Sequence, residues 1–582
     1  MKFPYGISDF AAIRFENYFY QDRTGWIPAL EEMGKQLLFL RPRRFGKSLL
    51  ITMLENYYDL RRANDFQTLF GELAIGQNPT PLHNQYFILR WDFSVVKAQG
   101  DARDIEVSLN RTIAGCIHRC ARQYHLSVEI NPEDGIYSFG NLLTAIQETG
   151  NKLYLFIDEY DNFANEILVA KQDQYDSLMY GDGLFRTLFK AVKAAAMGQG
   201  LDRVFITGVS PVAMSDITSG YNVAKNIYLK PQFNALCGFT GNEISEVLQT
   251  LATGQTAWSV QEALGLMRTF YNGYRFCEQE SETIYNPTLC LYFMEALQEQ
   301  KNYPEEMLDD NLSMDRNRLI YLAGLLEGEP LLIEALGEGD GLIIPRISRR
   351  FSVTDMLKKE RDRDTVISLF YYFGILTLAS RSGLGKWVMK IPNLVSRSLY
   401  VDQLRDLYVT AYDDRNALNG IKAALFEQGD LKPACEFMET RLFPVLSNRD
   451  YRWTNELTLK VMFMTVLYDD LHYMLVSETE VNHGYADLSF IVRPDSRIYP
   501  YLDLVIEFKY VSLKDLGMSG QDVRDKNHEE LMKLPLVVAK LAEAENQAIR
   551  YGYTLQDRYQ LDTMTRFAVV AIGLERVVYR EL

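Results

Sequence analysis

The sequence predicts a multidomain α/β protein with an N-terminal parallel sheet, a mainly helical middle and a second α/β domain at the C-terminus. Three observations support this fold class. Residues 1–238 alternate short apolar runs with amphipathic stretches, residues 239–440 are mostly helical in periodicity, and residues 441–582 return to strands alternating with helices. At about 100–200 residues per domain, a chain of 582 residues is expected to hold three to five domains. We therefore expect domain boundaries near these positions.

Short apolar runs locate the expected strands, and helical periodicity locates the helices between them. Strands are expected at residues 36–40, 86–91, 153–157, 204–207, 486–491, 502–509 and 567–572. Helices are expected at residues 47–60, 183–197, 366–377, 455–468 and 530–548, with a small hairpin at residues 383–391. No internal repeat or low-complexity tract is visible, so short connectors should join the domains.

The composition excludes several classes of protein. Hydrophobic residues make up 47% and aromatic residues 12% of the chain, which is enough to build buried cores and excludes global disorder. The longest apolar runs fall far short of the ~20 residues that span a membrane, and the N-terminus lacks a secretory signal. Six scattered cysteines do not suggest a disulfide framework, so we expect a cytoplasmic protein. The net charge of −16 leaves a nucleic-acid partner open, because an acidic average can conceal a basic groove.

A phosphate-binding segment follows the first expected strand. Gly46, Lys47 and Ser48 match the end of the pattern G-x-x-x-x-G-K-[ST], whose backbone N–H groups face phosphates at the start of a helix. In that pattern the lysine contacts the β- and γ-phosphates and the hydroxyl group binds Mg²⁺. Arg41 replaces the first glycine, and the arginines of the loop could add positive charge around the phosphates or form an exposed basic loop. The residues expected to bind nucleotide in this segment are Arg41, Pro42, Arg43, Arg44, Phe45, Gly46, Lys47, Ser48 and Leu49.

Polar residues end the third and fourth expected strands. Asp158 and Glu159 follow an apolar run, and the carboxyl edge of an open α/β sheet is where ligands bind. Asp158 would hold the hydration shell of Mg²⁺, and Glu159 would orient and polarise the attacking water. A solvated acidic turn is the alternative interpretation. Thr207 could sense the γ-phosphate, or it could belong to a β-turn with a capping serine.

These residues resemble the bacterial AAA-ATPase-like family of P-loop proteins. The resemblance rests on RPRRFGKS (41–48), FIDEYD (156–161), TGVSP (207–211), GISD (6–9), NYFYQDRT (17–24), YNGYRF (271–276) and YNP (285–287). Members of this family carry arginine in place of the first P-loop glycine, so Arg41 fits the family pattern, whereas Arg23 stands where the family generally has lysine. The resemblance implies ATP binding, with Mg²⁺, more firmly than rapid hydrolysis.

A second group of candidate catalytic residues lies near the C-terminus. Asp487 begins one expected strand, while Glu507 and Lys509 share a face of the next strand because side chains alternate with period 2. Two carboxylates from adjacent strands can share Mg²⁺, and a lysine can position or activate the hydrolytic water. By itself E-x-K on a strand is usually an exposed face with a cross-strand ion pair.

This segment resembles the PD-(D/E)XK nuclease superfamily, and specifically the nuclease domain commonly fused behind the AAA-ATPase-like domain. The resemblance implies a restriction-endonuclease-like fold at residues 441–582, with Mg²⁺ or Mn²⁺ held by Asp487 and Glu507. It also implies that Glu456, on the preceding helix, completes the site and that Gln547, in a Q-x-x-x-Y element, lies near it. Ala486 replaces the proline of the superfamily name.

The middle region resembles the winged-helix segment of the same ATPase family near residues 345–400. Such a segment could bind DNA, or it could serve as a spacer that packs against the ATPase. The basic residues that would contact DNA are Arg349, Arg350, Lys358 and Lys359. Two other groups are set aside: Cys116 and Cys120, with His118 and His125, lie in a helical pattern whose spacing fits no common zinc site, and His483 is expected in a loop.

The sequence thus predicts an ATP-binding and ATP-hydrolysing protein with a metal-dependent nuclease that cleaves DNA. Nucleotide would gate or power the nuclease, and analogy with the family suggests a role in defence against phage or mobile DNA. One alternative is an ATP-switched DNA- or protein-binding regulator with an inactive nuclease-like domain. Another is a nuclease directed at RNA. A homo-oligomer or a partner protein is compatible with both the ATPase and the nuclease, and no membrane association is expected.

Overall fold

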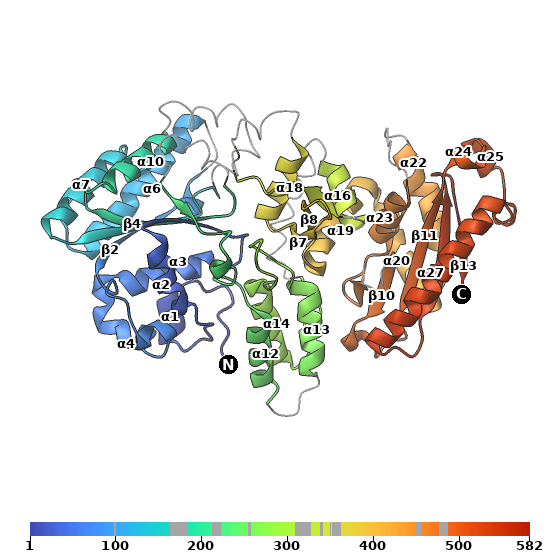
Figure 1. Cartoon of the computed structure of the whole chain (residues 1–582), viewed down its shortest axis with the longest axis horizontal. Helices are drawn as coiled ribbons and strands as arrows, with labels where there is room; N and C mark the ends of the chain where they lie inside the picture. Colours follow the sequence, from blue (N-terminus) through green and yellow to red (C-terminus); the bar gives the residue numbers. More distant parts are fainter. Residues whose placement is uncertain are drawn as a thin grey trace. The chain divides into compact units, whose positions relative to one another are not determined.

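The computed structural model describes residues 1–97, 101–162, 184–211, 223–253, 258–308, 328–337, 341–349, 351, 362–447, 455–476 and 487–582. The chain forms two compact units, which are Met1–Asn302 with Ile344–Met389, and Tyr303–Ile343 with Lys390–Leu582. The predicted multidomain α/β class is confirmed, with an N-terminal parallel sheet, a helical middle and a C-terminal mixed sheet (Figure 1). The domain boundaries expected from the sequence stay a prediction.

A parallel sheet organises the first unit. Its five strands lie in the order β2-β3-β4-β1-β5, and every neighbouring pair is parallel. The strands are β1 (Gln36–Leu40), β2 (Tyr86–Asp92), β3 (Lys152–Asp158), β4 (Leu201–Gly208) and β5 (Lys225–Asn226). The four longer strands are almost wholly buried, as expected for a sheet that helices cover on both faces. This order brings the carboxyl ends of β1, β4 and β3 side by side.

Helices cover both faces of this sheet. Figure 1 shows α6, α7 and α10 together on one face and α1 to α4 on the other. The helices of the sheet layer are α1 (Phe10–Phe15), α2 (Ile27–Met33), α3 (Lys47–Tyr58), α4 (Phe66–Phe70), α5 (Ala74–Gln77), α6 (Ala102–Gln123), α7 (Gly135–Glu148) and α10 (Leu184–Ala195). A separate helical group follows, formed by α12 (Gly241–Leu251), α13 (Val260–Tyr271) and α14 (Pro287–Gln300).

The helix expected at residues 366–377 is shorter than predicted. α18 (Arg363–Tyr372) ends before Gly374, whose φ of +77° is a left-handed conformation that glycine adopts readily. The amides of Ile375 and Leu376 then bond back to the carbonyl of Phe370, which closes the helix. The chain continues into a hairpin formed by β7 (Thr377–Arg381) and β8 (Trp387–Lys390), which begins earlier than the hairpin expected at residues 383–391.

A mixed sheet organises the C-terminal part of the second unit. Its order is β13-β12-β11-β10-β9, in which β11 and β12 are parallel and the other pairs are antiparallel. The strands are β9 (Tyr473–Val476), β10 (Leu488–Val492), β11 (Leu504–Val511), β12 (Thr565–Ile572) and β13 (Arg576–Glu581). The edge strands β9 and β13 were not predicted, because β9 has only four residues and β13 carries charged residues at both ends.

The long helix of this unit starts later and ends later than expected. α27 (Pro535–Tyr559) has proline in its first turn, where the missing N–H costs nothing, and a separate short helix, α26 (His528–Leu531), precedes it. Its apolar side packs on β11 and β12 and forms a buried core with Val511 and Val570. The other helices and strand of this unit are α16 (Gly328–Gly337), β6 (Leu342–Ile344), α19 (Leu394–Tyr408), α20 (Tyr412–Gln428), α21 (Lys432–Phe437), α22 (Phe443–Ser447), α23 (Glu456–Leu467), α24 (Leu513–Leu516) and α25 (Gly520–Arg524).

Among the described helices, none has the length and apolar character needed to cross a membrane. All six cysteines are buried as free thiols.

Candidate functional site

The loop between β1 and α3 has the backbone of a phosphate-binding turn. Arg44 and Gly46 both have positive φ, +62° and +81°, and α3 begins directly after them at Lys47. The helix therefore presents its first N–H groups at the mouth of the loop, where its positive end favours an anion. Gly46 is exposed at this point, whereas Lys47 is buried.

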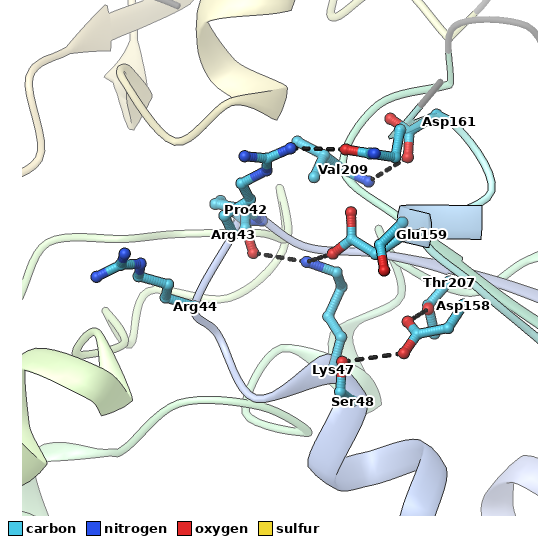
Figure 2. A network of polar contacts seen from close by, with 12 residues as sticks. Pro42, Arg43, Arg44, Lys47, Ser48, Asp158, Glu159, Asp161, Thr207 and Val209 are labelled. Carbon is cyan, nitrogen blue, oxygen red and sulfur yellow. Dashed lines mark hydrogen bonds and ion pairs between the residues drawn. The ribbon is translucent and has the colours of Figure 1, made fainter. Parts of the chain in front are cut away.

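Lys47 lies across the loop. Its Nζ donates a hydrogen bond to the carbonyl of Pro42 at 3.0 Å and lies 3.5 Å from Oε1 of Glu159 (Figure 2). Glu159 itself has a φ of +52°, an uncommon conformation that turns the chain directly after β3. The lysine, the loop carbonyl and the expected water-orienting carboxylate are thus brought together.

Asp158 is the centre of a second contact group. Its Oδ1 accepts a hydrogen bond from Thr207 Oγ1 at 2.6 Å, and its Oδ2 accepts one from Ser48 Oγ at 2.9 Å (Figure 2). Arg90 Nη2 also donates to Oδ2, at 2.7 Å. The structure therefore joins three expected site residues from β3, β4 and α3. It adds Arg90, which sequence reasoning missed although an arginine within the apolar run of β2 was a detectable signal.

Arg41 has a different position from the one expected. Its side chain is buried, and its guanidinium donates to the carbonyls of Leu40, Tyr228, Phe233 and Asn234. It therefore neither forms an exposed basic loop nor directs its charge to the mouth of the loop. Buried carbonyls need donors, and this arginine supplies them from beneath the loop.

Aromatic contacts fix the loop from the same side. The Phe276 ring packs against the Arg41 guanidinium, 4.1 Å from the ring centroid, and edge-to-face against Phe45 at 5.2 Å. Tyr274 makes a second edge-to-face contact with Phe45, at 4.8 Å. The YNGYRF segment, which belongs to the family resemblance, thus supports the phosphate loop from below.

The two remaining arginines of the loop point in different directions. Arg43 Nη2 donates to Asn162 Oδ1 at 2.7 Å, which ties the loop to the segment after β3. Asp161 in that segment accepts hydrogen bonds from the amides of Val209 and Ser210. Figure 2 shows the side chain of Arg44 directed away from Lys47.

An apolar pocket adjoins the phosphate loop. It is bordered by Gly46 and Leu49 at the start of α3, and it includes residues from the N-terminal segment, the turn before α12 and the start of α14. Its other lining side chains include Phe19, Tyr20, Phe45, Leu236, Phe239 and Leu291. A flat apolar ring system is the kind of group that such a lining accepts.

Asp487, which directly precedes β10, lies opposite Glu507 on β11 of the mixed sheet. The Asp487 amide donates to Glu507 Oε1 at 3.1 Å, and the Phe508 amide donates to Asp487 Oδ2 at 2.8 Å. The reciprocal bonds follow from the register of β10 on β11, in which Leu488 lies opposite Ile506. The two residues are therefore held side by side, the arrangement in which two carboxylates from adjacent strands could share a cation.

Lys509 and Glu456 complete this group. Lys509 Nζ donates to Glu456 Oε1 at 3.0 Å and to the Phe508 carbonyl at 2.9 Å. Glu456 is the first residue of α23 and remains 43% exposed, whereas Lys509 is buried. Glu456, the glutamate expected on the preceding helix, thus contacts Lys509 of the E-x-K motif.

Gln547 lies on α27, the helix that covers the face of β11 from which Glu507 and Lys509 project. Phe508 packs against Phe463 of α23, while Val511 packs with α27, so alternation places Glu507 and Lys509 on the α27 face. Gln547 is on α27, and its Oε1 is buried without a hydrogen-bond partner.

The pKa shifts in this group reflect burial and the charges of neighbouring side chains. Burial, reinforced by the charge of Asp487, raises the pKa of Glu507 well above its ordinary value. Burial also raises the pKa of Glu456, against the opposing effect of Lys509. Burial lowers the pKa of Lys509, but the neighbouring Glu456 and Asp487 charges outweigh it, so that pKa is raised. Two adjacent carboxylates short of positive charge are a favourable environment for a divalent cation.

Both groups offer the hard oxygen donors that Mg²⁺ prefers. Within the described ranges, no three His, Cys, Asp or Glu side chains are clustered as a ready-made metal site. Mg²⁺ is commonly bound through one or two carboxylates, with water and substrate phosphates completing the shell. The pairs Ser48 with Asp158, and Asp487 with Glu507, fit that mode.

The other candidates contribute less. Cys116 and Cys120 are buried on α6, in agreement with core packing. Arg349 is exposed, whereas Arg350, Lys358, Lys359 and His483 lie outside the described residues.

Two family descriptions match separate parts of the chain. Residues 4–218 match a predicted AAA-ATPase family, named AAA-ATPase-like, and residues 454–581 match the PD-(D/E)XK nuclease superfamily. The resemblances drawn from the sequence are confirmed at both ends. The chain carries an AAA-ATPase-like domain at its N-terminus and a PD-(D/E)XK nuclease superfamily domain at its C-terminus.

One relative matches along nearly the whole chain. It is an uncharacterised protein from the vnfD 5′ region of Azotobacter chroococcum mcd 1, 23% identical over 541 residues, with 91% of this chain and 93% of that protein covered.

Three solved structures are also similar to the chain. Cdc6p from Pyrobaculum aerophilum has a TM-score of 0.26 at 14% identity, covering 68% of this chain and 94% of that one. The Aeropyrum pernix ORC1 protein in complex with DNA has a TM-score of 0.27 at 12% identity, covering 69% and 97%. The Aeropyrum pernix ORC2 protein in its ADPNP-ADP complexes has a TM-score of 0.35 at 11% identity, covering 69% and 98%.

Proposed function

We propose that this chain, which joins an AAA-ATPase-like domain to a PD-(D/E)XK nuclease superfamily domain, is a nucleotide-controlled, metal-dependent nuclease that acts on DNA. The observation that carries the proposal is the grouping of Asp487, Glu507 and Lys509 on one sheet face, with Glu456 added from α23. An E-x-K strand on an ordinary surface would be exposed, whereas Glu507 is 1% and Lys509 5% exposed. A role in defence stays a prediction.

The N-terminal site supports binding and hydrolysis of ATP. The loop amides before α3 would bind the phosphates, and Lys47 would leave the Pro42 carbonyl for the β- and γ-phosphates. Ser48 and Asp158 would hold Mg²⁺, which neutralises charge on the phosphates when bound. Glu159 would orient the attacking water, and Thr207 would keep Asp158 in place through its 2.6 Å hydrogen bond.

The C-terminal site supports hydrolysis of a phosphodiester. Asp487 and Glu507 would hold Mg²⁺ or Mn²⁺, which polarises the scissile phosphate when bound. Lys509 would position the attacking water and balance the negative charge that develops on the phosphate. Glu456 would fix the lysine ammonium group through their 3.0 Å contact, and Gln547 would offer its unpartnered Oε1 to the substrate or its water.

The apolar pocket beside Gly46 would receive the base of the nucleotide. Leu291→Trp should fill this pocket and raise the dissociation constant for ATP about tenfold or more, the loss of roughly 1.4 kcal/mol of contact energy. Inorganic triphosphate, which has no base, should bind the variant and the wild type equally. The measurement is competition against a fluorescent ATP analogue, with Leu384→Trp on the 86% exposed hairpin leucine as a control of equal bulk. Equal ATP affinity in the Leu291 variant would place the base elsewhere.

The substrate is tested with matched DNA and RNA. We expect the full chain with Mg²⁺ or Mn²⁺ to cut plasmid or linear DNA and to leave RNA of the same sequence largely intact. Preferential cutting of the RNA would favour the RNA-directed alternative. If neither nucleic acid is cut under any metal or nucleotide condition, the regulator with an inactive nuclease-like domain is favoured.

A further inference from the structure

One carboxylate oxygen of Asp158 accepts two side-chain hydrogen bonds. Oδ2 accepts hydrogen bonds from Ser48 Oγ at 2.9 Å and from Arg90 Nη2 at 2.7 Å. Asp158 is 2% exposed, so these contacts replace solvent. Ser48 and Asp158 are the pair proposed to hold Mg²⁺, and the guanidinium of Arg90 therefore lies on the oxygen that faces the cation. Two positive charges beside one buried carboxylate repel each other.

A second acceptor for Arg90 lies close by. Glu55, on α3, has its Oε2 3.8 Å from Arg90 Nη1, too far for a hydrogen bond. Its Oε1 is buried and has no hydrogen-bond partner. Burial raises the pKa of Glu55 to about 7, as expected for a carboxyl group that lacks sufficient positive charge nearby. A closer guanidinium would supply both the missing donor and the missing charge.

The surroundings leave room for such a movement. A cavity of about 380 Å³ lies against β2 and α6, and its lining includes Glu55, Arg90, Asp92, Arg119 and Gln123. Arg90 keeps 30% of its side chain exposed, so its guanidinium is not confined by packing. A rotation of the side chain toward Glu55 therefore displaces no core residue.

We propose that Arg90 is a positioning residue that shares Asp158 with Mg²⁺, holding Oδ2 beside Ser48 and shifting to Glu55 as the cation binds. The inference rests on the proposed nucleotide site. In this role the positive charge of Arg90, on β2, moves between two carboxylates and sets how much Mg²⁺ the site requires. Glu55 receives that charge when Mg²⁺ is bound.

The test measures the Mg²⁺ concentration for half-maximal binding of a hydrolysis-resistant ATP analogue to the full chain. Arg90→Met removes the competing charge and should lower this concentration about tenfold, the effect of one charge within ~4–6 Å of an ionised group. Glu55→Gln should raise it, because the guanidinium then keeps Asp158 as its better partner. Arg119→Met removes a positive charge from the same cavity without contacting Asp158 or Glu55, and it should leave the value unchanged within about twofold.

A double variant separates this role from a general charge effect. If Glu55 acts through Arg90, adding Glu55→Gln to Arg90→Met should change nothing further, whereas a general loss of negative charge would raise the requirement in either background. A higher Mg²⁺ requirement in Arg90→Met, or additive effects in the double variant, overturns the inference. If Arg90→Met does not fold, an unchanged Mg²⁺ requirement in Glu55→Gln overturns it as well. Absence of Mg²⁺-dependent nucleotide binding in the wild type would overturn the proposed nucleotide site itself.

Discussion

Glu507→Gln should abolish metal-dependent cleavage and at the same time stabilise the fold. Loss of a metal-binding carboxylate is expected to lower the cleavage rate by about 10²–10³-fold, the contribution typical of a group that stabilises transition-state charge. The glutamine keeps the oxygen that accepts the Asp487 amide at 3.1 Å, so the local geometry should survive. The measurement is initial cleavage rate with saturating Mn²⁺.

The stability gain follows from the raised pKa of Glu507. Above its ordinary pKa of 4.5 the unfolded chain releases this proton while the folded chain retains it, so stability falls as the pH rises through that value. Glutamine does not ionise, so the variant avoids this loss of stability. It should therefore unfold at higher temperature than the wild type at pH 8 in EDTA, with the difference disappearing below pH 4.5. Each unit of pKa shift corresponds to about 1.4 kcal/mol. Glu545→Gln, at an exposed pair with Arg580, is the matched control, and a melting temperature for Glu507→Gln below that of the wild type at pH 8 would contradict the account.

Lys47→Ala should abolish turnover of ATP. Lys47 is buried at the end of the phosphate loop, where its ammonium group contacts the Pro42 carbonyl and the Glu159 carboxylate. Its loss therefore removes positive charge where the transferred phosphate would sit. We expect the rate of phosphate release to fall by about 10²-fold or more. Metal-dependent cleavage measured without nucleotide should persist, because Asp487 and Glu507 belong to a separate site.

Lys35→Ala provides the control for this variant. Lys35 belongs to the same domain, is 61% exposed and pairs with Asp202 at 2.6 Å, away from the loop. Its ATP turnover should match that of the wild type within about twofold, since exposed ion pairs contribute little. Unchanged turnover in Lys47→Ala would remove the phosphate loop from the proposed mechanism.

Residues that act through local sequence were predictable, and residues that act through distant contacts were not. Gly46, Lys47 and Ser48 form their turn within one short segment, so a motif predicts it. Glu507 and Lys509 share a strand, so alternation places them on one face. Arg41 is different, because the carbonyls that hold it come from residues 228–234 and only the fold shows that its charge turns inward.

Arg90 and the bounds of α27 show which signals were available in the sequence but not used. A charged residue within the buried run of β2 requires a partner, but the sequence does not say that Asp158 and Glu55 provide it. Pro535 marks the start of α27, since proline is favoured in the first turn of a helix and disfavoured inside one. The expected helix at residues 530–548 included this proline in its interior.

The most direct test of the central claim is a DNA cleavage assay with Mg²⁺, run with and without ATP on the wild type, Lys47→Ala and Glu507→Gln. We expect ATP to change the wild-type cleavage rate. Lys47→Ala should cut at the nucleotide-free rate whether or not ATP is present, and Glu507→Gln should hydrolyse ATP without cutting. Wild-type cleavage that continues undiminished in Glu507→Gln, or that is absent with every metal and nucleotide, would contradict the central claim.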